Sequence, residues 1–348
     1  AHASMNKIDL SEVEAFPGVV AVLQAQDIPG DNQCGPIIKD DPILADGEVH
    51  YVGQPIFIVV AESIDTARKA SRKAKIDYQD LAANITTQDA RAADEKVIPP
   101  MHLSRGEAKQ GLENAPNRLT DSFSVGGQDH FYLEGQAALA LPQEDGGMLV
   151  NSSTQHPTEI QHKVAEALGT PMHAVRVETR RMGGGFGGKE SQGNALAVAC
   201  AVAAARTGRP CKMRYDRDDD MIVTGKRHDF RIDYTVGFDA TGRISALDFT
   251  HYTRCGWAMD LSLPVADRAM LHADNAYHLD NIRITSHRLR TNTQSATAFR
   301  GFGGPQGIVG IERVMDHIAQ SLGVDPLTVR RANFYADVMQ PDATGKAH

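Results

Sequence analysis

Two glycine-rich segments of this 348-residue chain carry the residue types best suited to holding a ligand. GGGFGGKE, residues 183–190, ends in Glu190, and AFRGFGGPQG, residues 298–307, has Phe302 among its glycines. Glycine lets a backbone approach a ligand closely. The helix expected after each loop also points its positive end at the same place. We therefore expect a site for an oxo-bearing or anionic ligand where the two loops meet.

The first loop must be distinguished from a nucleotide-binding P-loop, because Gly183 to Lys189 has the spacing GxxxxGK. A P-loop continues with Ser or Thr, which holds magnesium, whereas this chain continues with Glu190. A carboxylate at that position repels phosphates. The sequence thus argues against a nucleoside triphosphatase. We expect Glu190 in the first turn of the helix that follows. For the loop taken alone, an alternative to a ligand site stays open: a purely structural turn with a solvated glutamate.

Three side chains could act on a flat heterocycle. The Glu190 carboxylate can accept hydrogen bonds from ring N–H groups, and Phe302 can offer its aromatic face. Arg268, in ADRAMLHADNAY, is a cation that needs a partner in a partly apolar stretch. Taken singly, Phe302 is more often a core residue, and a surface pair between Arg268 and Asp267 is the simpler interpretation.

Cysteine and histidine spacing gives no sign of a metal bound by side chains. There is no CxxC pair, and neither zinc nor iron–sulfur spacing is present. No HExxH motif occurs either. We therefore expect unpaired, buried thiols and no metal held directly by protein side chains, a judgement that covers Cys34, Cys200, Cys211, Cys255, His156, His162, His272 and His278.

Composition excludes two classes of partner. The net charge of −8 leaves no basic excess for binding a nucleic acid backbone. No apolar run reaches the length of a membrane span. The cysteines are expected to be free thiols, and no signal-peptide pattern is present; both observations favour a cytoplasmic location.

The elements that position the loops follow from periodicity. In the first part we expect strands at 19–22, 55–61 and 75–78 and a helix at 63–73 with Ser63 as its N-cap, which together form a small α/β unit. Residues 83–117 are polar and aperiodic, so they are interpreted as a surface linker. From residue 118 onward we expect an α+β domain with strands at 148–152, 175–179, 230–236 and 243–250 and helices at 157–168, 194–206 and 305–322.

The motifs together resemble one family. GGGFGGKE, AFRGFGGPQG, SSTQHP (152–157) and LADGEVHYVGQPIFIVVAES (44–63) are similar to signatures of the xanthine dehydrogenase/aldehyde oxidase family, in its molybdopterin-binding large subunit. The resemblance implies an amino-terminal α/β hammerhead domain at 1–82, a linker at 83–117 and the first part of a molybdopterin-binding α+β domain at 118–348. That last domain is expected to be truncated at its carboxyl end.

The resemblance also assigns contacts to the cofactor, molybdenum–molybdopterin. It implies that Gln155 hydrogen-bonds a molybdenum oxo ligand. Phe186 and Gly187 would contact the cofactor through their backbone, and Arg300 would lie at the cofactor end of the pocket. Molybdenum itself would be held through the pterin.

The substrate residues follow in the same way. Phe302 would stack on the substrate, Glu190 would bind and polarise a purine, and Arg268 would stabilise negative charge that builds on its ring. Asp267 stands where many family members have Glu. Aldehyde oxidases generally carry apolar residues at the positions of Glu190 and Arg268, so this pair favours a purine.

The activity implied is that of a xanthine dehydrogenase. Hypoxanthine or xanthine would be hydroxylated to xanthine or urate when a metal-bound hydroxide attacks a ring carbon and hydride passes to the metal's sulfido group. [2Fe–2S] clusters and FAD would lie on a small partner subunit, in a dimer of heterodimers with NAD as electron acceptor. The general-base glutamate would lie beyond this chain. Two alternatives stay open: a related molybdenum hydroxylase for an aldehyde or another N-heterocycle, and a non-catalytic scaffold partner.

Overall fold

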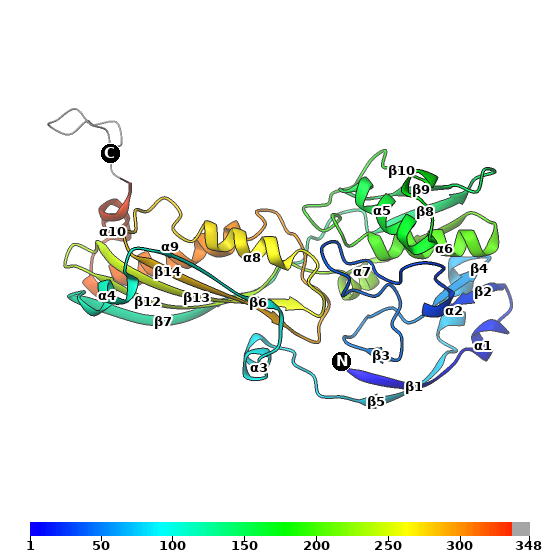
Figure 1. The fold of residues 1–348 in the computed structure, drawn as a ribbon, viewed down its shortest axis with the longest axis horizontal. Coiled ribbons are helices and arrows are strands. Elements are labelled where there is room, and N and C mark those ends of the chain that lie inside the picture. Colours follow the sequence, from blue (N-terminus) through cyan, green and yellow to red (C-terminus); the bar gives the residue numbers. More distant parts are fainter. Residues whose placement is uncertain (336–348) are drawn as a thin grey trace.

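The computed structural model describes residues 1–335 and has a mixed α+β fold, as expected. Figure 1 shows an elongated molecule: a long twisted sheet with its helices lies at one end, and three smaller sheets lie at the other. The last 13 residues of the predicted second domain, 336–348, lie outside the described residues. Within the described part, no helix combines the length and apolar character needed to cross a membrane.

The amino-terminal part combines short helices with two small antiparallel sheets. In the first the strand order is β3-β1-β5, and in the second β2 pairs with β4. The expected strands and the helix capped by Ser63 are present, and the Ser63 hydroxyl accepts a hydrogen bond from the Thr66 N–H at 3.1 Å. The strands on either side of this helix pair with different partners, so the α/β unit is built on two sheets. The elements are β1 (Ala3–Asp9), α1 (Ser11–Glu14), β2 (Val19–Leu23), η1 (Ala25–Asp27), β3 (Glu48–Val49), β4 (Ile58–Ala61), α2 (Ile64–Ser71) and β5 (Lys75–Asp80).

The segment expected to be an irregular linker is instead folded. Residues 83–117 contain α3 (Thr87–Ala92), β6 (Lys96–Arg105) and α4 (Ala108–Glu113). Strand β6 pairs antiparallel with β14 at the edge of the long sheet. An edge strand tolerates Pro99 and Pro100, which cannot donate to a ladder. Most β6 side chains are exposed or partly exposed, so the strand lacks the apolar alternation that would reveal it. The domain boundaries themselves stay a prediction.

The third small sheet carries the helices that flank the first glycine loop. Its strand order is β10-β9-β8-β11. Helix α5 ends at Gly169, whose φ of +66° gives the left-handed cap that glycine favours. Helix α6 consists mainly of small residues and is buried on nearly all sides. The elements are β8 (Ala137–Pro142), β9 (Met148–Ser152), α5 (Pro157–Leu168), η2 (Met172–Ala174), β10 (Val175–Glu178), α6 (Asn194–Thr207) and β11 (Cys211–Arg214).

The long sheet has the order β6-β14-β13-β12-β7, and helix α9 packs its apolar stripe against it. Ile311, Val314, Met315 and Ile318 of α9, which repeat with the helical period, are buried in this core. The four cysteines are unpaired, and three of them are buried. The elements are β7 (Asn117–Val125), α7 (Arg217–Val223), β12 (Phe230–Phe238), β13 (Ile244–Gly256), α8 (Ser262–Leu271), β14 (Ile282–Arg290), α9 (Gly304–Leu322) and α10 (Pro326–Asn333).

Candidate functional site

The two glycine loops are in direct contact. The Phe186 carbonyl accepts a hydrogen bond from the Arg300 N–H at 2.8 Å. Gly187 lies at φ +97°, and a Cβ added there would come within 2.8 Å of the Ala298 carbonyl carbon. Only glycine allows this approach, because an L side chain is disfavoured at that φ and has no room. The expectation that the loops meet is therefore confirmed.

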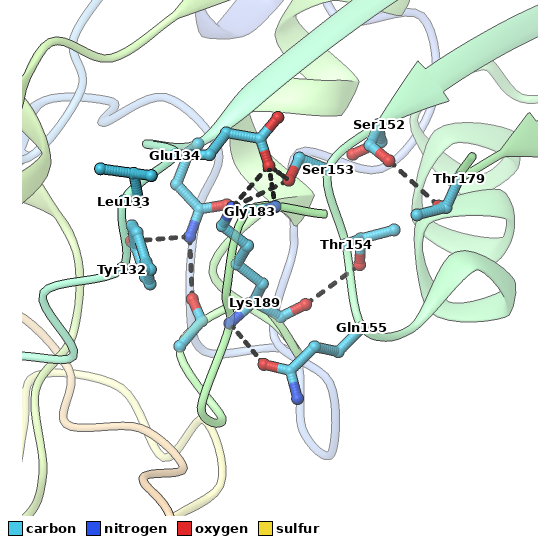
Figure 2. A network of polar contacts seen from close by, with 12 residues as sticks. Tyr132, Leu133, Glu134, Ser152, Ser153, Thr154, Gln155, Thr179, Gly183 and Lys189 are labelled. Carbon is cyan, nitrogen blue, oxygen red and sulfur yellow. Dashed lines mark hydrogen bonds and ion pairs between the residues drawn. The ribbon is translucent and has the colours of Figure 1, made fainter. Parts of the chain in front are cut away.

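Gln155 is fixed against the first loop by its side-chain oxygen. Oε1 accepts hydrogen bonds from the Gly187 N–H at 2.8 Å and the Lys189 N–H at 3.3 Å. Because two donors hold the oxygen, Nε2 is the end of the amide left to donate. The residue is exposed, and Figure 2 shows its nitrogen pointing away from the contact with the loop. An amide donor at this position suits an oxo or sulfido acceptor.

A buried network holds the first loop from behind (Figure 2). The Lys189 side chain is fully buried, and its Nζ donates to Ser153 Oγ at 2.8 Å and to Glu134 Oε2 at 3.2 Å. The same Glu134 oxygen accepts the Gly183 N–H at 2.7 Å. Desolvation lowers the pKa of Lys189 although the Glu134 carboxylate opposes this. The lysine of the GK pair thus anchors the loop and is not directed at a phosphate, a role that the sequence did not reveal.

The second loop is fixed by two residues from outside the predicted motifs. His130 Nε2 donates to the Ala298 carbonyl at 2.6 Å, and its ring stacks on Phe299 at a centroid distance of 4.7 Å. The Arg227 guanidinium lies 3.9 Å from the centroid of the same ring and donates to the Arg300 carbonyl at 2.9 Å. The Arg300 backbone is therefore held at both ends, whereas its side chain is exposed.

Backbone strain occurs at both predicted phenylalanines. Phe186 has φ +55° and Phe302 has φ +50°. Bulky residues rarely adopt positive φ, and each such residue costs about 1–3 kcal/mol. Phe186 is nonetheless 47% exposed, so burial in a core does not compensate for this cost. Backbone strain at two aromatic residues on touching loops, one of them exposed, is typical of a ligand site.

Glu190 lies on the connection after the first loop, and the expectation that it belongs to the first turn of a helix was wrong. Helix α6 is capped by Gly193, three residues later. The Glu190 carboxylate is half-buried, and within residues 1–335 it accepts no hydrogen bond. Burial raises its pKa, while His156 opposes the shift. A half-buried carboxyl without a partner can receive the N–H groups of a ligand.

Arg268 lies on α8, against the start of α9. Its Nε is 4.0 Å from a Cβ built on Gly304, and its side chain is exposed. The simpler interpretation of an Asp267–Arg268 pair was wrong, because Asp267 pairs with the buried Arg288. In the described part of the chain the Arg268 guanidinium has no ion pair or hydrogen bond. This cation is available to a ligand.

The seven predicted site residues thus fall into one connected region, although their roles stay predictions. Gln155, Phe186, Gly187 and Arg300 are linked by hydrogen bonds. Phe302 precedes Gly303, where a Cβ would come within 2.0 Å of the Val265 carbonyl, so this loop presses on α8 near Arg268. Among the described residues no hydrogen bond joins Glu190 directly to Arg268.

Comparisons with known proteins are consistent with this arrangement. Residues 90–334 match the family model of the molybdopterin cofactor-binding domain. Residues 1–82 match that of the aldehyde oxidase and xanthine dehydrogenase a/b hammerhead domain.

Curated relatives include xanthine dehydrogenase/oxidase from Mus musculus, 43% identical, and from Felis catus, 42% identical. In each case the alignment covers 97% of this chain and 25% of the relative. This chain therefore spans about a quarter of the length of these relatives.

Solved structures show the same fold. The aldehyde oxidoreductase from Desulfovibrio gigas superposes with a TM-score of 0.89 at 29% identity, over 99% of this chain and 40% of that one. The CO dehydrogenase from Oligotropha carboxidovorans superposes with a TM-score of 0.87 at 22% identity, over 98% of this chain and 46% of that one. The second likeness supports the fold only.

Proposed function

The chain belongs to the aldehyde oxidase and xanthine dehydrogenase family, and on that premise we propose that it forms the purine pocket of a molybdenum hydroxylase that converts hypoxanthine to xanthine and xanthine to urate. The relatives at 42–43% identity carry the name xanthine dehydrogenase/oxidase, which supports this substrate class. The activity of the whole protein is part of the proposal, because the chain spans only a quarter of those relatives.

The residues present fit a molybdenum–molybdopterin group. The Gln155 amide offers a donor for an oxo or sulfido ligand, since its oxygen is already held by the loop. The close approach of Gly187 to Ala298 holds the two loops together beside Gln155. Arg300 would contribute a guanidinium to the same end of the pocket. When bound, the group would supply the oxygen-transfer and two-electron chemistry of hydroxylation.

One observation carries the choice of a purine: within residues 1–335 neither the Glu190 carboxylate nor the Arg268 guanidinium makes a hydrogen bond or an ion pair, and the loops that carry or contact them touch each other. A purine presents ring N–H groups and carbonyl oxygens, so it needs an acceptor and a cation. An aldehyde needs neither. Glu190 would accept the ring N–H, Phe302 would stack on the ring, and Arg268 would offset the negative charge that develops during attack.

The assembly and electron transfer are further parts of the proposal. We expect [2Fe–2S] clusters and FAD on a small subunit, NAD as acceptor, a dimer of heterodimers and a cytoplasmic location. The curated relatives are about four times as long as this chain, so a single long polypeptide competes with the small-subunit arrangement. Denaturing electrophoresis of the enzyme isolated from its host distinguishes them: two bands support the small subunit, and one large band contradicts it.

The test uses the cofactor-loaded enzyme and its Glu190→Ala variant, assayed with xanthine and with an aromatic aldehyde. We expect the variant to lose xanthine turnover sharply and to retain aldehyde oxidation. Glu159→Ala, a change of a glutamate on α5, serves as the matched control. Equal xanthine rates for wild type and Glu190→Ala would refute the role of Glu190.

A second candidate, an aldehyde hydroxylase, is favoured by the 29% identity to the Desulfovibrio gigas aldehyde oxidoreductase. It predicts efficient aldehyde turnover by the wild type and no xanthine turnover.

A further inference from the structure

A group of two histidines and one glutamate lies in the amino-terminal part, where no metal was expected from the sequence motifs. Strand β1 pairs antiparallel with β3, with Ala3 opposite Val49 and Ser4 opposite Glu48. One step further in the same register places His2 opposite His50, and their ring centroids are 5.6 Å apart. Glu48 lies between the two rings in contact with both. Strand pairing therefore brings three metal-binding side chains to one place.

The atoms that face one another are those that bind metals. Glu48 Oε1 lies 2.5 Å from His2 Nε2 and 3.4 Å from His50 Nδ1. His2 Nδ1 lies 2.6 Å from the Ala82 carbonyl oxygen, which can only accept, so Nδ1 carries a proton. In the neutral ring the lone pair is then on Nε2, toward Glu48. This is the arrangement in which a backbone carbonyl orients a metal-ligating histidine.

We propose that His2, Glu48 and His50 bind a divalent transition-metal ion of the zinc type, separate from the molybdenum centre. Their ligand atoms all lie within 4.8 Å of one another. Two imidazole nitrogens and one carboxylate are an established ligand set for Zn²⁺, with a fourth position left for water. No other group of this kind is found within residues 1–335.

A simple ion pair explains less of the geometry than a metal does. A doubly protonated His2 would satisfy its own contacts with Ala82 and Glu48, but His50 Nδ1 would stay buried without a hydrogen-bond partner. An ion would use all three ligand atoms at once. Ligand atoms at about 2.0–2.1 Å from a tetrahedral ion lie roughly 3.3 Å apart. His50 and Glu48 already have this separation, whereas the shorter His2–Glu48 contact must open.

The site lies where the amino-terminal part meets the long sheet. The His50 ring stacks on Trp257 at 3.7 Å with an interplanar angle of 9°, and the His50 carbonyl accepts from Asn292 Nδ2 at 3.0 Å. The Arg290 guanidinium lies 4.9 Å from the Trp257 ring and opposes a bound cation, whereas the Glu48 carboxylate favours one. An ion held here would tie the chain's first strands to the domain that carries Trp257.

Trp257 also provides the assay, since it is the single tryptophan of the 348-residue chain. Metal-free chain is titrated with Co²⁺ while tryptophan fluorescence and visible absorption are recorded, and Zn²⁺ is then added as a competitor. We expect saturable quenching with one-to-one stoichiometry, a Kd in the micromolar range or below, cobalt absorption bands of a site with nitrogen ligands, and reversal by Zn²⁺.

The variants make the test specific. His50→Gln and Glu48→Gln should each weaken binding at least tenfold. His162→Gln, which removes an exposed histidine that lies 3.5 Å from Glu166 on α5, should leave binding unchanged. Trp257→Phe should abolish the fluorescence signal and keep the absorption bands. The proposal fails if no saturable signal appears at millimolar metal, or if His50→Gln and Glu48→Gln bind as tightly as wild type.

Discussion

Asp260 lies close to the proposed purine pocket and gives a prediction whose size can be worked out. It is 2% exposed, has φ +40°, and its Oδ2 has no hydrogen-bond partner among the described residues. Together with Asp41 and Ser191 it lines a cavity of about 50 Å³. Burial raises the pKa of Asp260 to about 6, and the charge of Glu190 adds to the shift. The change to test is Asp260→Asn, because asparagine has the same side-chain shape as aspartate and also tolerates a positive φ.

The pKa shift sets the size and the sign of the effect. The carboxyl rises from 3.8 to about 6, and each unit corresponds to about 1.4 kcal/mol, so ionised Asp260 costs the folded state on the order of 3 kcal/mol. Between these pH values the folded state binds the proton more strongly than the unfolded state. Stability is therefore lost as the pH rises from about 4 to about 6, and the loss persists above that range. Asp41, whose pKa burial raises to about 7, acts in the same direction.

The assay is urea unfolding of wild type and Asp260→Asn at pH 4.5 and pH 8, followed by the fluorescence of Trp257, which lies three residues away along the chain. About 1 kcal/mol of the cost of about 3 kcal/mol is already present at pH 4.5. We therefore expect the free energy of unfolding of the variant minus that of wild type to be about 2 kcal/mol larger at pH 8 than at pH 4.5. If the difference in free energy of unfolding between variant and wild type is the same at both pH values, ionisation of Asp260 does not destabilise the folded state, and the reasoning is refuted.

Three further predictions concern the loops. Gly187→Ala, which places a Cβ 2.8 Å from the Ala298 carbonyl carbon, should lower the molybdenum content of the loaded enzyme in elemental analysis. The control Gly208→Ala, at φ +66° with open space around the Cβ, should leave the molybdenum content unchanged. Equal molybdenum contents in the Gly187→Ala and Gly208→Ala enzymes would contradict the role of the close approach between Gly187 and Ala298. Lys189→Met should lower the free energy of unfolding by about 2 kcal/mol in calorimetry, because Glu134 loses its buried partner, and an unchanged Tm would argue against an anchoring role. Because burial raises the pKa of Glu190, kcat/KM for xanthine should rise with pH through a value above the ordinary glutamate range, and Glu190→Gln should lack this limb of the profile.

Much of the fold could be predicted from local sequence signals. Strand β9 and helix α5 begin and end where expected, because Pro157 and Gly169 mark the helix ends and apolar residues repeat with the helical period. The meeting of the two glycine loops was also predicted, because glycine patterns show where a backbone comes close to another group.

Other parts depend on partners far apart in the sequence and could not be predicted. The edge strand β6 is identified only by its pairing with β14, because its side chains do not alternate between buried and exposed positions. Lys189 is satisfied by Glu134, 55 residues away, so its burial is not readable from the GK motif. His130 and Arg227 hold the second loop from similarly distant positions.

The most direct test of the central claim is a crystal structure of the cofactor-loaded enzyme with a bound purine. We predict that the Glu190 carboxylate accepts a ring N–H, that the Arg268 guanidinium contacts a purine oxygen, and that the Phe302 ring stacks on the heterocycle. A purine held elsewhere, with Glu190 and Arg268 both turned away from it, would contradict the account.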